Sequence, residues 1–368
     1  MNILAAVARG RSEPLGFESL NLADPADDEI LVKLVASGVC HTDLRAIEIE
    51  GMVPKPIVLG HEGAGVVEAV GSAITKVKPG DSVLLTFDSC GTCPSCSARA
   101  PSYCQHLLAR NFSGKKPSGS IPYTDTNGAP VFGNFFGQSS FATHALCRSR
   151  NVVKVAASAP LDLLAPLGCG VQTGAGAVMR SLKVGDGQSL AVFGTGSVGL
   201  SAIMGARIVG ADPIIAIDVN PARLAAARDL GATHTIDASR EDVAARLREI
   251  TGHGVNFAID TSGLARSVKT AVESLAPLGT CGVIAATREP EVGIVTRQLM
   301  VGGRSIRGIA EGDSIPDEFI PELVEHHARG RLPLERLVTH FPFERINEAI
   351  HEAHTGAVIK PILRMGNR

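Results

Sequence analysis

The chain has 368 residues, of which 45% are hydrophobic and 20% charged, and its formal net charge at pH 7 is −2. This length exceeds what one hydrophobic core usually holds, so two domains are expected. The balanced charge, the two tyrosines and the lack of tryptophan argue against nucleic acid or an anionic membrane as a partner.

The N-terminal segment MNILAAVARG has a short apolar run with no basic residue before it, so it predicts a first β-strand and not a signal peptide. No window of the sequence reaches the roughly 18 apolar residues that a membrane span needs. We therefore expect a cytoplasmic protein. In that reducing compartment, eight cysteines indicate metal ligands or buried thiols in preference to disulfides.

The first third of the chain contains short β-like runs broken by Gly and Pro, such as EILVKLVASGVC, GAGVVEAVG and DSVLLTF. This pattern predicts a compact, mainly β domain. Residues 105–140 carry the turn signals SGKKPSGS and TDTNGAP, so we expect a long surface excursion there.

Four cysteines lie close together, in the spacing C-x2-C-x2-C-x7-C: Cys90, Cys93, Cys96 and Cys104. Zinc binds four thiolate or imidazole ligands, and a site closed by four protein ligands is structural. Four free thiols would oxidise readily, and the surroundings are not basic enough for a nucleic-acid-binding zinc ribbon. The spacing therefore predicts a structural zinc ion in a lobe at about residues 89–105, here called the cysteine lobe.

From about residue 185, the strands SLAVFG, IIAID, HTID, NFAID and GTCGVIA alternate with helices such as VGLSAIMGARIVGA and NPARLAAARDLG. Such alternation predicts a parallel, doubly wound sheet. The second helix has Asn220 as its cap, Pro221 in its first turn and Gly231 at its end. After about residue 308 the pattern is mixed, which suits a return to the first domain.

The motif GTGSVG, with Gly194, Gly196 and Gly199, lies between a predicted strand and a predicted helix. Asp218 ends the next strand, near the spacing of about 20 residues found in the dinucleotide fingerprint. The helix N-terminus would bind the pyrophosphate. Asp218 would bind the adenosine ribose hydroxyls and repel a 2′-phosphate, which favours NAD over NADP.

Three further residues that can bind metal stand alone, Cys40 in GVCHTD, His61 in GHEGAG and Cys169 in PLGCG. A lone cysteine is usually a small buried hydrophobe, and a lone histidine is more often a core residue than a ligand. Their spacing establishes no site.

Taken together and in order, GVCHTD, GHEGAGVVEAVG, the cysteine lobe, PLGCGVQTG and GTGSVG with Asp218 resemble the zinc-dependent medium-chain alcohol dehydrogenases over nearly the whole chain. The resemblance implies an α/β protein with two domains and an active cleft between them. Residues 1–170 and 309–368 would form a GroES-like, mainly β catalytic domain that carries the cysteine lobe. Residues 171–308 would form a Rossmann NAD-binding domain.

The same resemblance implies a catalytic zinc ion held by Cys40, His61 and Cys169, with water or a substrate oxygen in the fourth position. Glu62 lies near the metal in this family and would coordinate it transiently during ligand exchange. Asp43 would orient His61 and fix its tautomer. With the cysteine lobe, this implies two zinc ions per chain.

The implied reaction is hydride transfer from a zinc-bound alkoxide to nicotinamide C4, because zinc lowers the pKa of a bound alcohol. Thr42 is placed to accept the alcohol proton and pass it to the nicotinamide ribose. The family often has a histidine at the position of Arg45, which cannot release a proton near neutral pH. Beyond Thr42, the proton route stays open between water and another path, and Arg45 is a solvated or a cofactor-facing charge.

The resemblance also assigns NAD contacts outside the glycine-rich turn. By position, His41 and Lys360 would contact the pyrophosphate. Thr173 and Val198 would pack on the nicotinamide, and Arg223 would lie near the adenosine ribose.

The segment VFGNFFGQSSFATHA, residues 131–145, resembles the aryl-alcohol (benzyl-alcohol) branch of the family, which includes enzymes for allylic terpene alcohols. The implied activity is reversible oxidation of primary aryl or allylic alcohols, of the benzyl alcohol, geraniol or perillyl alcohol type, to aldehydes. An apolar channel suits such substrates, and by alignment its residues would be Phe135, Phe136, Thr86, Tyr103, Ala109, Ala286 and Ile309. The alternative is that the Phe pair fills core.

Other activities of the same fold remain open. A glutathione-dependent formaldehyde dehydrogenase or a general aliphatic alcohol dehydrogenase fits the layout, whereas polyol enzymes commonly have Glu at the position of Cys169. A non-catalytic NAD- or zinc-binding protein is disfavoured because the three ligands are intact. We expect a homodimer or a tetramer, associated through the sheet edge of the coenzyme domain, and buried thiols without a metal role at Cys147 and Cys281.

Overall fold

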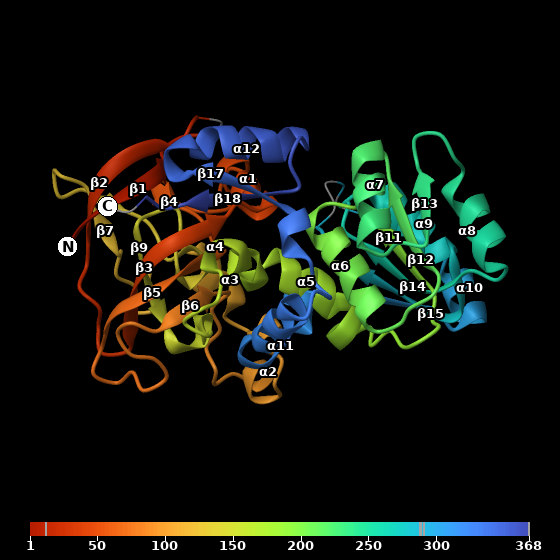
Figure 1. The fold of residues 1–368 in the computed structure, drawn as a ribbon, viewed down its shortest axis with the longest axis horizontal. Coiled ribbons are helices and arrows are strands. Elements are labelled where there is room, and N and C mark those ends of the chain that lie inside the picture. Colours follow the sequence, from red (N-terminus) through yellow and green to blue (C-terminus); the bar gives the residue numbers. More distant parts are fainter. Residues whose placement is uncertain (12, 287–288, 290, 367–368) are drawn as a thin grey trace. The chain divides into compact units, whose positions relative to one another are not determined.

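In a computed structural model of the protein, residues 1–11, 13–286, 289 and 291–366 are described. The chain divides into two compact units, which are described separately (Figure 1). Unit 1 comprises Met1–Cys169, Ile315–Glu325 and Leu337–Arg368, and unit 2 comprises Gly170–Ser314 and His326–Arg336.

Unit 1 is mainly β, as the Gly- and Pro-broken apolar runs predicted. Its first sheet has the order β4-β1-β2-β7-β8, with β1 (Asn2–Ala8), β2 (Gly16–Leu22), β4 (Ile57–Val58), β7 (Tyr123–Thr124) and β8 (Pro130–Val131). The second sheet has the order β10-β6-β5-β3-β18-β17, and β9 also pairs with β3. Its strands are β3 (Glu29–Gly38), β5 (Gly63–Val70), β6 (Ser82–Leu85), β9 (His144–Arg148), β10 (Val152–Lys154), β17 (Val338–Pro342) and β18 (Lys360–Arg364). The pairings are antiparallel except that of β17 with β18.

Short helices connect these strands. They are α1 (His41–Glu48), α2 (Pro94–Ser97), α3 (Leu107–Phe112), α4 (Leu161–Leu164) and α12 (Ile346–Thr355), with the single turns η1 (Pro101–Tyr103), η2 (Phe135–Gly137) and η4 (Ala165–Gly168). The helix α11 (Pro316–Ala328) begins in unit 1, and its last three residues belong to unit 2. Apolar side chains from β1, β4 and α1 pack with Phe135 and Phe141 in one buried core.

Unit 2 contains a six-stranded parallel sheet of order β13-β12-β11-β14-β15-β16, and its helices run beside the strands (Figure 1). The strands are β11 (Leu190–Phe193), β12 (Ile214–Asp218), β13 (His234–Asp237), β14 (Val255–Asp260), β15 (Leu275–Val283) and β16 (Ser305–Gly308). The helices are α5 (Gly170–Gly176), α6 (Ser197–Ile208), α7 (Pro221–Leu230), α8 (Val243–Thr251), α9 (Ala265–Glu273) and α10 (Thr296–Gly302). The central strands β11 and β12 are buried along their whole length, as expected of a sheet covered on both faces. This confirms the predicted α/β fold class.

The predicted ends of α7 are also confirmed. The Asn220 side chain accepts hydrogen bonds from the backbone N–H groups of Ala222 and Arg223, and Pro221 occupies the first turn. Gly231 ends the helix at φ 127°, a conformation that residues with a Cβ rarely adopt.

The expectation of a surface excursion over residues 105–140 is only partly correct. Residues 117–120 and 126–130 are exposed, but residues 133–140 are all buried. The buried Lys116 ammonium bonds to Glu29 at 2.8 Å and thereby fixes the start of the exposed part to the sheet. The turn signals correctly marked the exposed residues, whereas the aromatic content of the following stretch draws it into the core.

The contacts also place two segments differently from the domain limits expected from the sequence. Residues 309–314 and 326–336 belong to unit 2, whereas the family resemblance implied that all of residues 309–368 would belong to the first domain. Cys147 and Cys281 are 1% and 0% exposed and lie outside both groups of metal-binding side chains found among the described residues. None of the described helices combines the length and the apolar character required to cross a bilayer.

Candidate metal centres and coenzyme site

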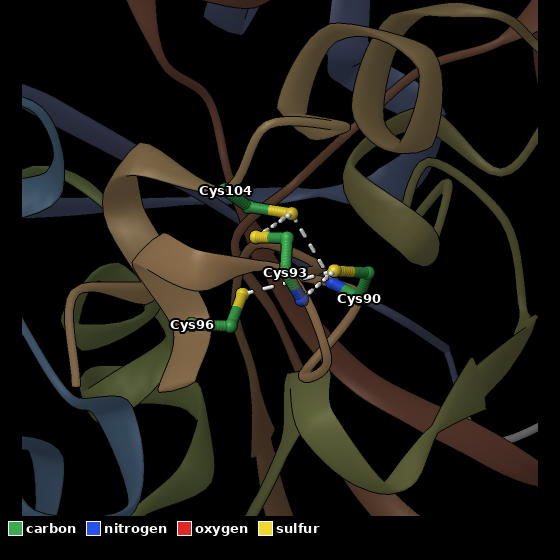
Figure 2. Close-up of side chains that lie close together, drawn as sticks. All are labelled: Cys90, Cys93, Cys96 and Cys104. Carbon is green, nitrogen blue, oxygen red and sulfur yellow. Dashed lines mark hydrogen bonds between the residues drawn. The ribbon is translucent and has the colours of Figure 1, made fainter. Parts of the chain in front are cut away.

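The cysteine lobe brings its four thiols together around one point, as Figure 2 shows. The Sγ atoms of Cys90 and Cys96 are 3.9 Å apart, and those of Cys93 and Cys104 are 4.0 Å apart. A disulfide requires about 2.05 Å, whereas a tetrahedron with metal–sulfur bonds of about 2.3 Å has edges of about 3.8 Å. The four sulfurs therefore have the spacing of a tetrahedral zinc site.

Backbone N–H groups of the lobe point at the sulfurs. Those of Thr92 and Cys93 donate to Cys90 Sγ at 3.5 and 3.3 Å, and that of Gln105 donates to Cys93 Sγ at 3.5 Å. The Thr92 and Cys93 donors lower the pKa of the Cys90 thiol to about 5. Cys90 is thus suited to the thiolate form, in which cysteine binds a metal, whereas burial raises the pKa of Cys96 to about 12 and also raises that of Cys104.

A second group unites side chains that are far apart in the sequence. Ligand atoms of Cys40, His61, Glu62 and Cys169 all lie within 4.8 Å of one another. Cys40 immediately precedes α1, His61 and Glu62 lie between β4 and β5, and Cys169 follows η4. All four belong to unit 1, and His61 and Glu62 are completely buried.

The carboxylate of Asp43 connects two of these segments. Its Oδ1 lies 2.9 Å from His61 Nδ1 and accepts the Gly60 N–H at 3.1 Å, while Oδ2 accepts the Cys40 N–H at 2.9 Å. Because Asp43 can only accept when ionised, it selects the His61 tautomer with the proton on Nδ1. The remaining nitrogen, Nε2, is buried and has no hydrogen-bond partner among the described residues. A buried orphan nitrogen next to two thiols fits a metal ion.

Charge also shapes this group. A hydrogen bond with Cys169, together with the Lys360 charge, holds the pKa of the Cys40 thiol well below its ordinary value. Burial lowers the pKa of His61, but the negative charges of Asp43 and Cys40 outweigh it and raise that pKa well above the ordinary value. A metal ion bound here would require His61 in its neutral form, since a ligating imidazole is neutral.

Glu62 is held away from solvent by Lys360. The ammonium Nζ donates to Oε1 and Oε2 of Glu62, both at 2.9 Å, and to Val39 O at 3.2 Å. A Cβ on Gly38 would lie 2.0 Å from Glu62 Oε2, so only glycine allows this packing. The three donors of Lys360 all have an acceptor within the protein, and binding a pyrophosphate would require one of these bonds to break.

Other residues expected near the reaction are placed as follows. Thr42 Oγ1 is half-buried and lies 3.9 Å from Cys40 Sγ, whereas His41 is exposed. Thr86 is buried, and its hydroxyl donates to the carbonyl of Gly168, beside Cys169, at 2.7 Å.

The residues expected to line the substrate channel do not form one surface within unit 1. Phe135 is 0% exposed and packs in the unit 1 core, and Phe136 is 7% exposed. Tyr103 and Ala109 are exposed in unit 1, while the exposed Ala286 and the buried Ile309 belong to unit 2. The core-filling alternative thus fits both phenylalanines, which belong to the same buried cluster.

The glycine-rich turn of unit 2 joins β11 to α6. Gly194 has φ 89°, and a Cβ on Gly199 would lie 1.9 Å from the Gly194 carbonyl oxygen, so both positions require glycine. A Cβ on Gly196 would meet no described atom within 4 Å. The turn therefore leaves open space above its backbone at the start of a helix, which fits a dinucleotide phosphate.

Asp218, at the end of β12, already binds this turn. Its Oδ2 accepts from the N–H and the hydroxyl of Thr195 at 2.7 and 2.8 Å, and its Oδ1 accepts from the N–H groups of Val219 and Asn220 at 2.7 and 3.0 Å. Ribose hydroxyls would have to replace one of these donors. Six further residues expected to contact NAD belong to unit 2 with Asp218: Thr173 on α5, Val198, Arg223, and the turn glycines Gly194, Gly196 and Gly199.

Sequence reasoning missed Gln138. Its side chain is 1% exposed, accepts the Gly63 N–H at 2.9 Å, and donates to the carbonyls of His61 and Thr86 at 2.9 and 3.2 Å. The signal was present, since a polar amide within the aromatic run NFFGQSSF is unusual for a core segment. Its partners, however, are 52 to 77 residues away, and no local pattern names them.

Known proteins share this arrangement. Residues 26–157 match the family model described as alcohol dehydrogenase GroES-like domain, and residues 197–328 match zinc-binding dehydrogenase. The geraniol dehydrogenase of Castellaniella defragrans is 46% identical over 362 residues, covering 98% of this chain and 96% of that protein.

Two solved structures align with this chain over its whole length and over their own whole length. The benzyl alcohol dehydrogenase of Acinetobacter calcoaceticus has a TM-score of 0.96 at 41% identity. An alcohol dehydrogenase zinc-binding domain protein from Burkholderia ambifaria has a TM-score of 0.98 at 47% identity.

Replacing one cysteine of the lobe tests its structural role. We expect Cys93→Ser to lose one of two metal ions per chain and to lower Tm by at least about 5 °C, roughly 2 kcal/mol, while the remaining folded protein keeps turnover. Metal analysis, thermal unfolding and initial rates measure this. Cys147→Ser, a buried cysteine outside both groups, should keep both ions. A Cys93→Ser protein with full stability and metal content but no turnover would contradict a structural role.

Proposed function

Since the chain belongs to the zinc-dependent medium-chain alcohol dehydrogenases, and is therefore a zinc alcohol dehydrogenase, we propose that it oxidises primary aryl or allylic alcohols reversibly to aldehydes with NAD. The extended likeness to a geraniol dehydrogenase and to a benzyl alcohol dehydrogenase supports this substrate class. In such alcohols the developing carbonyl is conjugated with a double bond or an aromatic ring, which makes oxidation easier.

We assign the catalytic zinc to Cys40, His61 and Cys169, and the structural zinc to the cysteine lobe. The observation that carries the first assignment is the convergence of two thiols on the unpartnered Nε2 of the buried His61. Three protein ligands leave a coordination position for substrate, whereas four cysteines leave none. When bound, zinc supplies a Lewis acid that lowers the pKa of an alcohol, and NAD supplies the hydride acceptor.

The chain's own residues then have separate tasks. Asp43 holds His61 in the tautomer that presents Nε2, and it fixes the backbone at Cys40. The Thr42 hydroxyl, beside Cys40, accepts the alcohol proton at Oγ1. Arg45 cannot accept it further, so the proton leaves Thr42 to water or a coenzyme hydroxyl. Glu62, which is hydrogen-bonded by Lys360, would coordinate the metal transiently while ligands exchange.

For the coenzyme, the glycine-rich turn would bind the pyrophosphate and Asp218 the adenosine ribose. Open space above Gly196 at the start of α6 supports this assignment. The remaining contacts proposed from position are Gly194, Val198, Gly199, Arg223, Thr173, His41 and Lys360.

A homodimer through the edge of the unit 2 sheet is also proposed. All four residues of the edge strand β16 are exposed. Ile306 of this strand is 41% exposed, and Leu278 of the paired strand β15 and Met300 and Val301 of α10 are 82, 76 and 73% exposed. A strand at the end of a parallel sheet with an apolar flank can continue that sheet into a second copy across a two-fold axis.

The substrate class is tested by NADH formation from benzyl alcohol, geraniol, ethanol and sorbitol at equal concentrations. We expect kcat/KM for benzyl alcohol or geraniol to exceed that for ethanol at least about tenfold, because apolar groups each add to binding in an apolar pocket. Preference for ethanol or sorbitol would refute the substrate class. Formaldehyde oxidation that requires added glutathione would indicate the formaldehyde dehydrogenase alternative.

Coenzyme choice is tested with Asp218→Gly. Loss of the carboxylate removes its repulsion of a 2′-phosphate, so the NAD-to-NADP ratio of kcat/KM should fall at least about tenfold. Thr195→Val is the matched control, because it removes one hydrogen bond to Asp218 but keeps the charge. An unchanged ratio in Asp218→Gly, or an equal fall in Thr195→Val, would contradict the assigned role.

The interface is tested by light scattering after size exclusion. The wild type should have at least twice the mass of the chain, and Met300→Asp should halve it by burying a charge in the apolar contact. Leu108→Asp is the control, since Leu108 is similarly exposed, at 72%, but lies in unit 1. A monomeric wild type, or dissociation by Leu108→Asp alone, would contradict this interface.

A further inference from the structure

The segment Asn134–Ser140, here called the collar, has an unusual backbone. Asn134, Phe136 and Ser139 have φ values of 55°, 51° and 54°, and Gly137 between them has 68°. Residues with a Cβ rarely adopt this left-handed region, and each such residue raises the energy of the fold. Three of them in six positions require strong compensating contacts.

Those contacts are hydrogen bonds to the segment that carries His61. Gln138 accepts the Gly63 N–H and donates to the His61 carbonyl. Ser139 Oγ donates to the Val58 carbonyl at 2.7 Å, and the Phe141 N–H donates to that of Leu59 at 2.9 Å. The collar and the adjoining Phe141 therefore bind backbone groups of Val58, Leu59, His61 and Gly63.

The left-handed turn at Phe136 brings two phenylalanine rings into contact with His61. The Phe136 ring is stacked on the His61 imidazole, with centroids 4.5 Å apart and planes at 25°. Phe135 meets the same imidazole with its plane at 82°, at 5.5 Å. Phe112 packs against both phenylalanines, at 5.6 and 5.1 Å, and within the described part of the chain its ring does not contact His61.

Two restraints therefore act on the imidazole. The Asp43 hydrogen bond fixes the direction of Nδ1 and hence of Nε2, but one bond leaves the ring free to tilt. The stacked Phe136 and the nearly perpendicular Phe135 block that tilt. A ring that carries positive charge binds an aromatic face more strongly than a neutral ring does, so stacking also favours His61 with a cation on Nε2.

We propose that Phe136 is a positioning residue for His61, so that one ring controls metal retention as well as the substrate channel assigned to it. This rests on the proposed function, in which His61 is a zinc ligand. Its consequence is that substitutions at Phe136 made to change substrate preference also weaken metal binding. A residue that lined the substrate channel without contacting His61 would not weaken metal binding when it is replaced.

The test compares zinc release to a chelator from Phe136→Leu, Phe136→Tyr and Phe112→Leu holoenzymes. Phe136→Leu should release one of the two ions about tenfold faster, the scale of effect for removing an orienting partner of a ligand. Phe136→Tyr retains the ring and should stay within about twofold of the wild type. Phe112→Leu loosens the same cluster without touching His61 and should also stay close to the wild type.

A second readout is the visible spectrum of the cobalt-substituted protein. It should shift in Phe136→Leu and not in Phe112→Leu, because only the former changes the geometry at His61. Unchanged release and spectrum in Phe136→Leu would overturn the proposal, as would equal acceleration in Phe112→Leu. A wild type with zinc only in the cysteine lobe would instead refute the proposed catalytic site, and this inference with it.

Discussion

The proposed reaction centre depends on one buried carboxylate. Asp43 binds the His61 ring, the Gly60 N–H and the Cys40 N–H, so it joins the start of α1 to the segment before β5. Two of the three proposed zinc ligands acquire their relative positions in this way. Without these donors, an ionised carboxylate at 0% exposure would be very unfavourable. The same bonds therefore stabilise the fold and orient the site.

Buried charge is handled similarly elsewhere. Glu62 is neutralised by Lys360, and Asp218 is satisfied by four donors from Thr195, Val219 and Asn220. Asp218 stands at the end of a strand, where irregular backbone offers N–H groups that need an acceptor. Preorganised polar groups of this kind cost little reorganisation when charge develops in a reaction. The collar restrains the site in a different way. Its phenylalanine rings limit the tilt of the His61 imidazole, whereas the Asp43 hydrogen bond fixes only the direction of the ring nitrogens.

Sequence reasoning succeeded where the determining contacts are local. The strand–turn–helix pattern around Gly194 and the close spacing of the four lobe cysteines each lie within a short stretch, so periodicity and spacing predict both. Cys40, His61 and Cys169 are brought together only by the tertiary fold, and a family resemblance was needed to connect them. The burial of residues 133–140 could not be predicted, because the Gln138 and Ser139 side chains bind backbone groups of Gly63 and Val58, which are distant in the sequence. Phe135, for which a channel position and a core position were both open, is buried in contact with other rings.

The central claim is that a catalytic metal is bound by Cys40, His61 and Cys169. Anomalous diffraction from crystals of the purified protein, recorded on both sides of the zinc absorption edge, tests it most directly. The account predicts two zinc peaks per chain, one among the four lobe sulfurs and one bonded to Cys40 Sγ, Cys169 Sγ and Nε2 of His61. A single peak in the cysteine lobe, or a second peak away from His61 Nε2, would contradict it.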